Sequence, residues 1–280
     1  MTVTDQAMAT QKNIFITGSS KGLGKTAAQM FQARGWGVAA TMRNPAAGAD
    51  LAALDRTHVI ELDVADPAQI EAAAAAAIDK LGHIDVVFNN AGYGLAGPFE
   101  GADDERVRRQ LDTNLLGVLR TTRAFLPHLR ARRAGLVITT TSIGGLIALP
   151  FNSVYHATKW ALEGWSESMW HELRAHGVGI KTVSPGGIAT DFATSSLDFV
   201  THDDYTEQLN TALASFQSRG SDYSTAEQIA EVVYEAATDG KDQLRYVAGA
   251  DANAWYQKRL EIGDQAFMEF IHQSFLGDAS

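Results

Sequence analysis

Short apolar runs rich in β-branched residues alternate with longer helix-prone stretches along most of the chain, and this alternation restricts the fold more than any other feature. Successive βα units of this kind build a parallel sheet that helices cover on both faces. The alternation therefore predicts a three-layer, doubly wound α/β fold with about seven parallel strands. The expected strands are residues 13–17, 37–42, 58–62, 85–89, 135–141, 179–184 and 245–248.

Helices are expected between these strands. Pro67 suits the first turn of one helix, and Asp103 precedes another in the manner of an N-cap residue. Between Pro185 and Thr225 lies one long connection, and long connections in compact domains often bind ligands. The last thirty or so residues predict one more helix with aromatic anchors. The helices expected within the domain are residues 23–33, 67–81, 104–130, 153–176 and 225–238.

Composition excludes several classes of function. The chain contains no cysteine, which excludes disulfides, thiolate metal sites and a cysteine nucleophile. A formal net charge of -10 opposes binding to nucleic acid and to anionic membranes, because both rely on basic surfaces. No stretch is apolar enough to span a membrane, and residues 1–12 lack the features of a signal peptide. We expect a cytoplasmic protein that acts on a small molecule, with no nucleic-acid or membrane partner.

A glycine-rich turn joins the first expected strand to the first expected helix, where residues 17–24 read TGSSKGLG. Glycine permits a tight turn and a close backbone approach, while the free N–H groups and the dipole of the helix attract anionic oxygen. A glycine at a turn often serves only the backbone, but the strand–turn–helix context favours a diphosphate site. The residues expected to form it are Thr17, Gly18, Ser20, Lys21, Gly22, Leu23 and Gly24.

Charges around the second strand favour a phosphate on the adenosine ribose. In dinucleotide folds an acidic residue after this strand binds the ribose hydroxyls, whereas an arginine there accommodates a 2′-phosphate. No Asp or Glu occurs in residues 18–49, and Arg43 follows the second strand directly. We expect Arg43 and Lys21 to bind one phosphate dianion, which predicts NADP(H) rather than NAD(H). Lys25 and Arg34 are interpreted as solvated surface charges.

Tyr155 and Lys159 are candidates for proton transfer. Their spacing of four residues places both side chains on one face of a helix, where an ammonium group lowers the pKa of a phenol from its usual ~10. The same spacing occurs by chance in many helices. Ser142 closes the fifth strand, and ligands of open α/β sheets bind at the carboxyl ends of strands, so the position favours the catalytic interpretation.

Further motifs lie at the other strand ends. Residues 89–92 read NNAG after the fourth strand, Asn114 lies in the following helix, and Pro185 and Gly186 close the sixth strand. With the glycine turn and the Tyr-x-x-x-Lys spacing, these motifs resemble the short-chain dehydrogenase/reductase family, in its one-domain branch, over roughly residues 13–250. The resemblance implies a Rossmann-like fold in a single domain. It also implies an NADP-dependent oxidoreductase that interconverts a carbonyl and an alcohol.

The resemblance further implies a role for each motif residue. Tyr155 would transfer the proton, while Lys159 would lower the pKa of Tyr155 and bind the nicotinamide ribose. Ser142 would orient the carbonyl, and Asn114 would hold a water that relays protons behind the lysine. No metal ligand is expected. The remaining implied cofactor contacts are Asp63, Val64, Asn90, Ala91, Gly92, Tyr155, Lys159, Pro185, Gly186, Ile188 and Thr190.

Three segments follow from these interpretations. Residues 1–12 are expected to form a flexible N-terminal tail, and residues 251–280 a helical C-terminal extension. Residues 13–250 are expected to form the NADP-binding catalytic domain, with a substrate loop at about residues 186–224.

Apolar residues after the strand ends predict a lipophilic ketone, aldehyde or secondary alcohol as the substrate, unless several of them simply complete the core. These residues are Tyr93, Leu95, Phe99, Leu146, Ile147, Phe151 and Phe192.

Trp160, Trp165 and Trp170 are spread around the circumference of the helix that carries Tyr155. A helix that is apolar on all sides is buried on more than one side, which predicts that it packs on the sheet and also against another subunit. The family resemblance implies a homodimer or homotetramer that packs through this helix and the one before it. The alternative is that residues 251–280 cover it.

Two other functions compete with a reductase. A regulator that senses NADP without turnover would have no need of the four residues Asn114, Ser142, Tyr155 and Lys159 together. An epimerase or dehydratase that uses its cofactor internally usually carries a larger substrate domain than a chain of 280 residues allows. Both are weaker predictions than the oxidoreductase.

Overall fold

A computed structural model of the chain describes residues 11–189, 196–219 and 223–277. Seven strands form one parallel sheet in the order β3-β2-β1-β4-β6-β7-β9, so the predicted doubly wound α/β fold is confirmed. The strands are β1 (Asn13–Ile16), β2 (Gly37–Met42), β3 (Thr57–Glu61), β4 (Val86–Asn89), β6 (Leu136–Thr140), β7 (Gly179–Pro185) and β9 (Arg245–Ala248).

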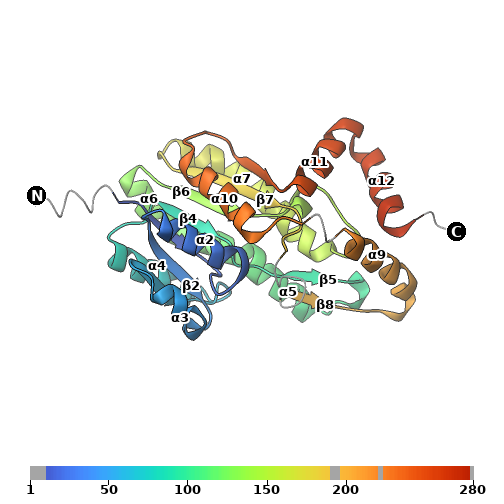
Figure 1. The fold of residues 1–280 in the computed structure, drawn as a ribbon, viewed down its shortest axis with the longest axis horizontal. Helices are drawn as coiled ribbons and strands as arrows, with labels where there is room; N and C mark the ends of the chain where they lie inside the picture. Colours follow the sequence, from blue (N-terminus) through green and yellow to red (C-terminus); the bar gives the residue numbers. More distant parts are fainter. Residues whose placement is uncertain (1–10, 190–195, 220–222, 278–280) are drawn as a thin grey trace, which may run out of the picture.

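Helices cover both faces of this sheet (Figure 1). Alternate residues of a strand point to opposite faces, and in β1 Ile14 packs on α2 and α10 whereas Phe15 packs against Phe125 of α6. Both faces are therefore buried, which explains why the strands read as continuous apolar runs. The helices are α2 (Gly22–Ala33), α3 (Ala49–Ala52), α4 (Pro67–Leu81), α5 (Asp104–Leu111), α6 (Gly117–Arg132), α7 (Ser153–Arg174), α9 (Thr206–Ser218), α10 (Ala226–Thr238), α11 (Ala250–Ile262) and α12 (Asp264–Leu276).

The order of the strands reverses between β1 and β4. The chain builds outward from β1 to β2 and β3, then returns to place β4 on the other side of β1. The crevice at the carboxyl ends of two such strands is where open α/β sheets bind their ligands. The glycine turn follows β1 and the NNAG motif follows β4, so both lie at this point.

The single helix expected over residues 104–130 is interrupted, and that prediction is wrong. Helix α5 gives way to a π-helical turn, Asp112–Leu116, before α6 continues to Arg132. Asn114 lies in this turn with its side chain buried, and its amide exchanges two hydrogen bonds with the backbone of Tyr93, at 3.0 and 2.8 Å. Pairing with the neighbouring loop compensates for the disturbed helix, and π-turns are frequent at functional sites.

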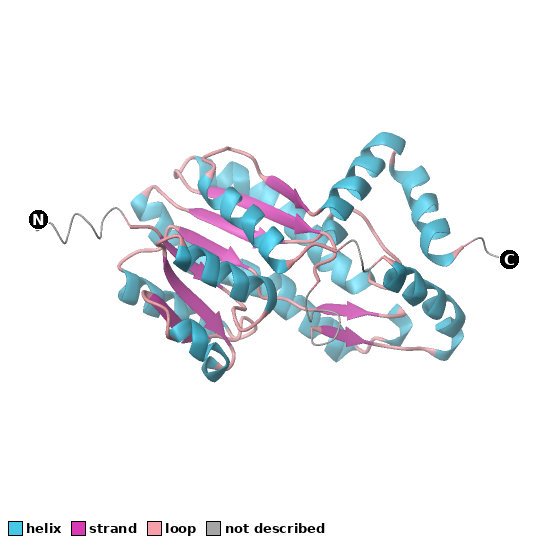
Figure 2. Cartoon of the chain, in the orientation of Figure 1, coloured by secondary structure: helices cyan, strands magenta, loops and turns pink. Residues whose placement is uncertain are grey.

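The connection expected as a long loop contains more regular structure than the sequence indicated. Strand β8 (Leu197–Phe199) pairs in parallel with β5 (Gly94–Ala96), and α9 follows. Neither strand nor α9 was among the expected elements. Figure 2 shows β5, β8 and α9 beyond one end of the large sheet, on the side where α11 and α12 also lie.

The C-terminal segment forms two helices where one was expected. Gly263, with φ of 81°, separates α11 from α12 and allows the chain to turn back. Phe267 and Phe275 of α12 are buried against Ile143 and Ile147, which follow β6. The extension therefore packs onto the loop after β6. Within the described residues, no helix combines the length and apolarity that a membrane crossing requires.

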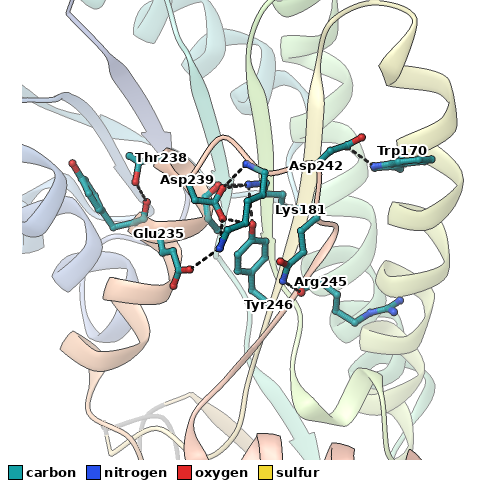
Figure 3. Close-up of polar contacts among 12 residues, drawn as sticks. Trp170, Lys181, Glu235, Thr238, Asp239, Asp242, Arg245 and Tyr246 are labelled. Atoms are coloured by element: carbon teal, nitrogen blue, oxygen red, sulfur yellow. Dashed lines mark hydrogen bonds and ion pairs between the residues drawn. The ribbon is translucent and has the colours of Figure 1, made fainter.

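A buried ion pair closes the β9 edge of the sheet (Figure 3). The Lys181 ammonium group donates to Asp239 Oδ1 at 2.7 Å and to the Ala236 carbonyl at 2.8 Å, while the Tyr246 hydroxyl donates to Asp239 Oδ2 at 2.6 Å. Burial acts to raise the pKa of Asp239, but the hydrogen bonds from Lys181 and Tyr246 outweigh it and lower the pKa to about 2. These contacts tie β7 and β9 to the end of α10.

Thr225→Ala is expected to lower the free energy of unfolding by ~1 kcal/mol. Thr225 caps α10 by accepting from the Gln228 backbone N–H at 3.2 Å, and the Gln228 side chain accepts from the Thr225 N–H at 2.8 Å. Urea unfolding measures the loss. Thr211→Ala is the matched control, since it removes an exposed hydroxyl from α9 that caps no helix end. Equal losses in the two variants would contradict the role of the cap.

Candidate active site

The turn after β1 holds its backbone so close to neighbouring segments that side chains are excluded. Gly18 has φ of 72°, and a β-carbon there would lie 2.9 Å from the Cα atom of Ala91. A β-carbon at Gly24 would lie 2.3 Å from the carbonyl oxygen of Gly18. Both positions therefore require glycine, as the motif predicts.

The segment after β4 is fixed to this turn by hydrogen bonds. The Thr17 hydroxyl accepts from the backbone N–H groups of Asn90 and Ala91, each at 2.9 Å. The Asn90 side chain donates back to the Thr17 carbonyl at 3.0 Å and lies 3.3 Å from the Gly18 carbonyl. Gly92 lies against Asn114, where a β-carbon would approach its Oδ1 atom to 3.2 Å. The two motifs thus form one rigid unit.

The N-terminus of α2 points out of the glycine turn with its first N–H groups available to a ligand. The N-cap residue, Lys21, makes no side-chain capping hydrogen bond, and no acidic residue lies in the first turn. Leu23 and Gly24 are buried, whereas Ser20 and Gly22 are partly exposed. A helix start of this kind attracts an anion through its N–H groups and its dipole.

Two of the basic side chains near this turn form ion pairs with acidic residues, and Arg43 does not among the described residues. Lys25 pairs with Asp50 at 2.7 Å, and Arg34 pairs with Glu231. These contacts agree with surface roles for both. Arg43 is exposed directly after β2, and it makes no hydrogen bond or ion pair within the described residues. Arg43 therefore keeps its full hydrogen-bonding capacity for a ligand.

Ser142 begins the turn that follows β6. Its hydroxyl accepts from the Gly144 N–H at 3.0 Å and caps a short 3₁₀ turn, Ile143–Gly145. A hydrogen bond between Ser142 and Tyr155 acts to lower the pKa of the tyrosine, although burial outweighs it and raises the pKa. The phenol therefore keeps its proton at neutral pH in the structure as described.

Lys159 is buried one helical turn after Tyr155 on α7. Its ammonium group donates to the Thr140 carbonyl at 2.8 Å and lies 5.6 Å from the centre of the Tyr155 ring. Burial lowers the pKa of Lys159 to about 8, against the opposing effect of the Glu163 carboxylate. The predicted pair is therefore brought together, and the lowered pKa of Lys159 lies close to neutral pH.

His156 adjoins Tyr155 but cannot serve as an acid or base at neutral pH. Burial lowers its pKa to about 4, so the ring is neutral. Its Nδ1 atom accepts from the Leu149 N–H at 3.3 Å, and its ring packs on Gly144. His156 therefore holds the loop after Ser142 in place.

A chain of hydrogen bonds connects the glycine turn to the Tyr155–Lys159 pair. Asn90, already bonded to Thr17, accepts from the Thr140 hydroxyl at 3.4 Å, and the Thr140 carbonyl accepts from Lys159. Ser142 follows Thr140 by two residues. The structure thus places the N-terminus of α2 and the Tyr155–Lys159 pair in one connected site at the carboxyl edge of the sheet.

The other predicted contacts lie around the same edge. Asp63 and Val64 follow β3, where Asp63 accepts from the Ala65 N–H at 2.9 Å and Val64 packs on Gly117. Gly186 donates to the Ala248 carbonyl at 3.0 Å, directly after Pro185 ends β7. Ile188 forms an isolated bridge with Ser224. Thr190 lies outside the described residues.

Several residues expected to form an apolar wall belong to the core instead. Leu95 packs with Val154 and Val200, while Leu146 and Ile147 are buried with the C-terminal helices. Each is less than a tenth exposed. Phe192 lies outside the described residues. The residues that keep accessible surface are Tyr93, Phe99 and Phe151.

Sequence reasoning missed two acidic residues that contact the site. Glu163 is buried beneath Lys159, and the i+4 spacing that links Tyr155 to Lys159 continues to it. Asp251 accepts from the Gly187 N–H at 2.8 Å and supports the loop after β7 from the start of α11. The i+4 spacing places Glu163 on the helix face of Lys159, but only its contacts with β7 and β9 show that it is buried. No local pattern indicates Asp251.

The comparisons with known proteins agree with this geometry. The sequence profile of short chain dehydrogenases matches residues 12–200. The chain belongs to the short-chain dehydrogenase/reductase family. It is therefore an oxidoreductase of a family that binds NAD or NADP, and the predicted resemblance is confirmed at that level.

Individual relatives match over nearly the whole chain. Oxidoreductase BOA17 of Botryotinia fuckeliana is 35% identical over 256 residues, which cover 89% of this chain and 92% of that protein. A short-chain dehydrogenase structure from Streptomyces avermitilis has a TM-score of 0.83 and 30% identity, and covers 94% of this chain and 96% of its own. A Burkholderia cenocepacia short chain dehydrogenase in complex with NADP has a TM-score of 0.76 and 25% identity, covering 93% and 97%.

Proposed function

We propose that this short-chain dehydrogenase/reductase is an NADP-dependent enzyme that interconverts a lipophilic ketone or aldehyde and its alcohol. The observation that carries the proposal is the hydrogen-bonded path from the glycine turn through Asn90 and Thr140 to Lys159, which lies 5.6 Å from the centre of the Tyr155 ring. It joins a site for a dinucleotide to a group that transfers protons. A protein that only bound the nucleotide would need the first of these alone.

The residues of the glycine turn fit a dinucleotide diphosphate. The cradle at Gly18 and Gly24 has no room for side chains, and the start of α2 offers N–H groups. The Arg43 guanidinium makes no hydrogen bond or ion pair among the described residues, which suits a 2′-phosphate. Lys21 would supply a second positive charge for the same phosphate.

The remaining predicted contacts would hold the rest of the cofactor. Asp63 and Val64 lie on the adenine side of this arrangement. The residues proposed to line the adenosine ribose and the nicotinamide are Asn90, Ala91, Gly92, Tyr155, Lys159, Pro185, Gly186 and Ile188, with Thr190 beyond the described residues.

When bound, the reduced nicotinamide supplies a hydride equivalent to the carbonyl carbon. Ser142 donates a hydrogen bond to the carbonyl oxygen and so positions it beside the phenol. Tyr155 gives its proton to the same oxygen, and its raised pKa keeps that proton available at neutral pH. Lys159 stabilises the phenolate that forms, because its ammonium group lies on the same helix face.

Asn114 would hold a water that relays protons behind Lys159. Its side-chain amide exchanges two hydrogen bonds with the Tyr93 backbone, which fix the amide in place. An amide can accept two hydrogen bonds and donate two, so capacity for a water remains.

The apolar side chains that keep accessible surface after the strand ends support a lipophilic substrate. They are Tyr93, Phe99 and Phe151.

Purified protein supplied with NADPH is expected to oxidise it stoichiometrically with at least one ketone or aldehyde, and faster with apolar than with charged carbonyls of equal size. Absorbance at 340 nm follows NADPH, and product analysis follows the alcohol. No NADPH consumption with any carbonyl would favour a nucleotide-sensing protein. Conversion of a substrate without net oxidation of NADPH would favour an epimerase.

We also propose a homodimer or homotetramer that packs through α7. Trp160 on this helix remains 43% exposed, although Arg259 of α11 lies over its ring at 5.1 Å. Trp165 and Trp170 pack on the core beneath α7. The C-terminal extension thus covers part of the helix and leaves part of it for a second subunit.

A further inference from the structure

Glu163 is a carboxylate buried beneath the reacting groups. It lies on α7 one turn after Lys159 and two turns after Tyr155, and it is only 4% exposed. A buried carboxylate costs free energy unless it is paired and hydrogen-bonded. The hydrogen-bond and ion-pair partners of Glu163 therefore indicate its role.

Both carboxylate oxygens of Glu163 accept hydrogen bonds from hydroxyl groups at strand ends. Oε1 lies 2.6 Å from the Thr141 hydroxyl and 2.9 Å from the Ser184 hydroxyl. Oε2 accepts from Thr182 at 3.2 Å. These donors belong to β7 and to the residue that directly precedes Ser142. Glu163 thus ties α7 to the strand ends that carry the reacting groups.

Arg245 of β9 completes the shell around Glu163. Its guanidinium donates to Glu163 Oε2 at 2.8 Å and also pairs with Glu167, one turn further along α7. In Figure 3 the Arg245 side chain extends toward α7, whereas Lys181 meets Asp239 on the other side of the sheet. Among the residues that the structure describes, the charged and titratable groups that face Glu163 and Lys159 are Arg245, Glu167 and Tyr155, with neutral His156 adjacent.

The turn after Ser142 rests on α7 between Lys159 and Glu163. A β-carbon on Gly145 would lie 2.9 Å from the Lys159 carbonyl oxygen and 3.2 Å from Glu163 Cγ. The glycine lets the turn sit directly on the helix. Ser142, Lys159 and Glu163 are consequently parts of one packed unit.

We propose that Glu163 is a positioning residue for the proton-transfer pair, whose buried negative charge keeps the Lys159 amine protonated and whose hydrogen bonds hold α7 against the Ser142 turn. This inference rests on the proposed reductase function. Burial alone lowers the pKa of Lys159, and the Glu163 carboxylate opposes that change, so the pKa stays at about 8. Without the carboxylate the ammonium form would be lost at lower pH.

The direction of the pH effect follows from the form of Lys159 that is needed. Carbonyl reduction requires the ammonium form, so the rate should fall as the pH rises through the pKa of Lys159. The raised pKa of Tyr155 puts loss of the phenol proton at higher pH. The alkaline limb of the pH–rate profile with NADPH therefore reports Lys159.

Glu163→Gln is expected to move the midpoint of this limb down by ~1 pH unit, because a nearby opposite charge is removed. Glu163→Asp, which keeps the charge, should restore a midpoint near that of the wild type even if the variant is less stable. Glu167→Gln is the matched control, since it also removes a partner of Arg245 but lies exposed and farther from Lys159. Its midpoint should not move.

A second readout needs no substrate. In full-length protein labelled with ¹³C at lysine Cε, the Lys159 signal, assigned by its absence in Lys159→Met, gives the pKa directly by NMR. The same downward shift is expected in Glu163→Gln and not in Glu167→Gln. If NMR shows the shift and no carbonyl is reduced by any variant, the electrostatic role stands and the proposed reductase function fails.

The opposite outcome overturns the inference. If the wild type reduces carbonyls and Glu163→Gln lowers the rate by the same factor at every pH, with an unchanged Lys159 pKa, then Glu163 has only a structural role. A Glu163→Asp midpoint as low as that of Glu163→Gln would overturn the electrostatic role as well.

Discussion

Tyr155→Phe is expected to lower the rate of NADPH-dependent carbonyl reduction by ~10²–10⁴-fold, the usual contribution of a positioned proton donor. The phenol is the only group that lies on the helix face of Lys159 and bonds to Ser142 among the described residues. The neighbouring histidine cannot replace it, since burial lowers the pKa of His156 to about 4. Steady-state kinetics at saturating NADPH measures the loss as kcat.

Two further measurements make this result specific. NADPH affinity, followed by fluorescence titration, should change little, because the ring that packs beside Lys159 is kept. Tyr205→Phe removes another phenol hydroxyl, one bonded to Glu100 on the surface, and should retain full activity. If Tyr155→Phe kept the wild-type kcat, the proposed mechanism would be wrong.

Most of the fold was predictable because each strand of the large sheet is buried on both faces. Such strands must be apolar throughout, and the helices between them begin at recognisable residues such as Pro67 and Thr225. All seven expected strands occur, with ends that differ by two residues or fewer from the expected ones. Local sequence thus predicts the position of a strand when both faces of that strand are buried.

The elements that sequence reasoning missed depend on contacts between distant segments. Strand β8 exists because Leu197 and Phe199 pair with β5, about a hundred residues earlier. The π-turn at Asn114 depends on the backbone of Tyr93. The hydrophobic periodicity within a segment does not indicate a contact with a distant segment. Short strands such as β8 and the π-turn at Asn114 therefore cannot be predicted from local sequence.

The candidate site was predictable to the extent that strand ends define it. Ser142, Asn90 and the glycine turn each follow a strand, and parallel strands bring their carboxyl ends to one edge. Glu163 was not recognised, because an acidic residue inside a helix is most often a solvated surface charge. Only the packing of β7 and β9 shows that it is buried.

Arg43→Ala is expected to raise the KM for NADPH by ~10–100-fold while leaving the KM for NADH nearly unchanged, since a charge-assisted hydrogen bond contributes ~1.5–3 kcal/mol. The two cofactors differ only in the 2′-phosphate, so the ratio of the two effects isolates the contact with that group. The wild type should correspondingly prefer NADPH. Initial rates with each cofactor at saturating substrate give both values.

Lys25→Ala is the matched control for this substitution. It removes a cation from the same region, but one that is paired with Asp50 at 2.7 Å and therefore not free to bind phosphate. The control should leave the ratio of the two KM values unchanged. Wild-type protein that binds NADH as tightly as NADPH, or an Arg43→Ala variant with an unaltered preference, would remove the assignment of NADP. The assignment of Tyr155 and Lys159 would stand, because both are proposed to lie at the nicotinamide end and neither is proposed to bind the ribose that carries the phosphate.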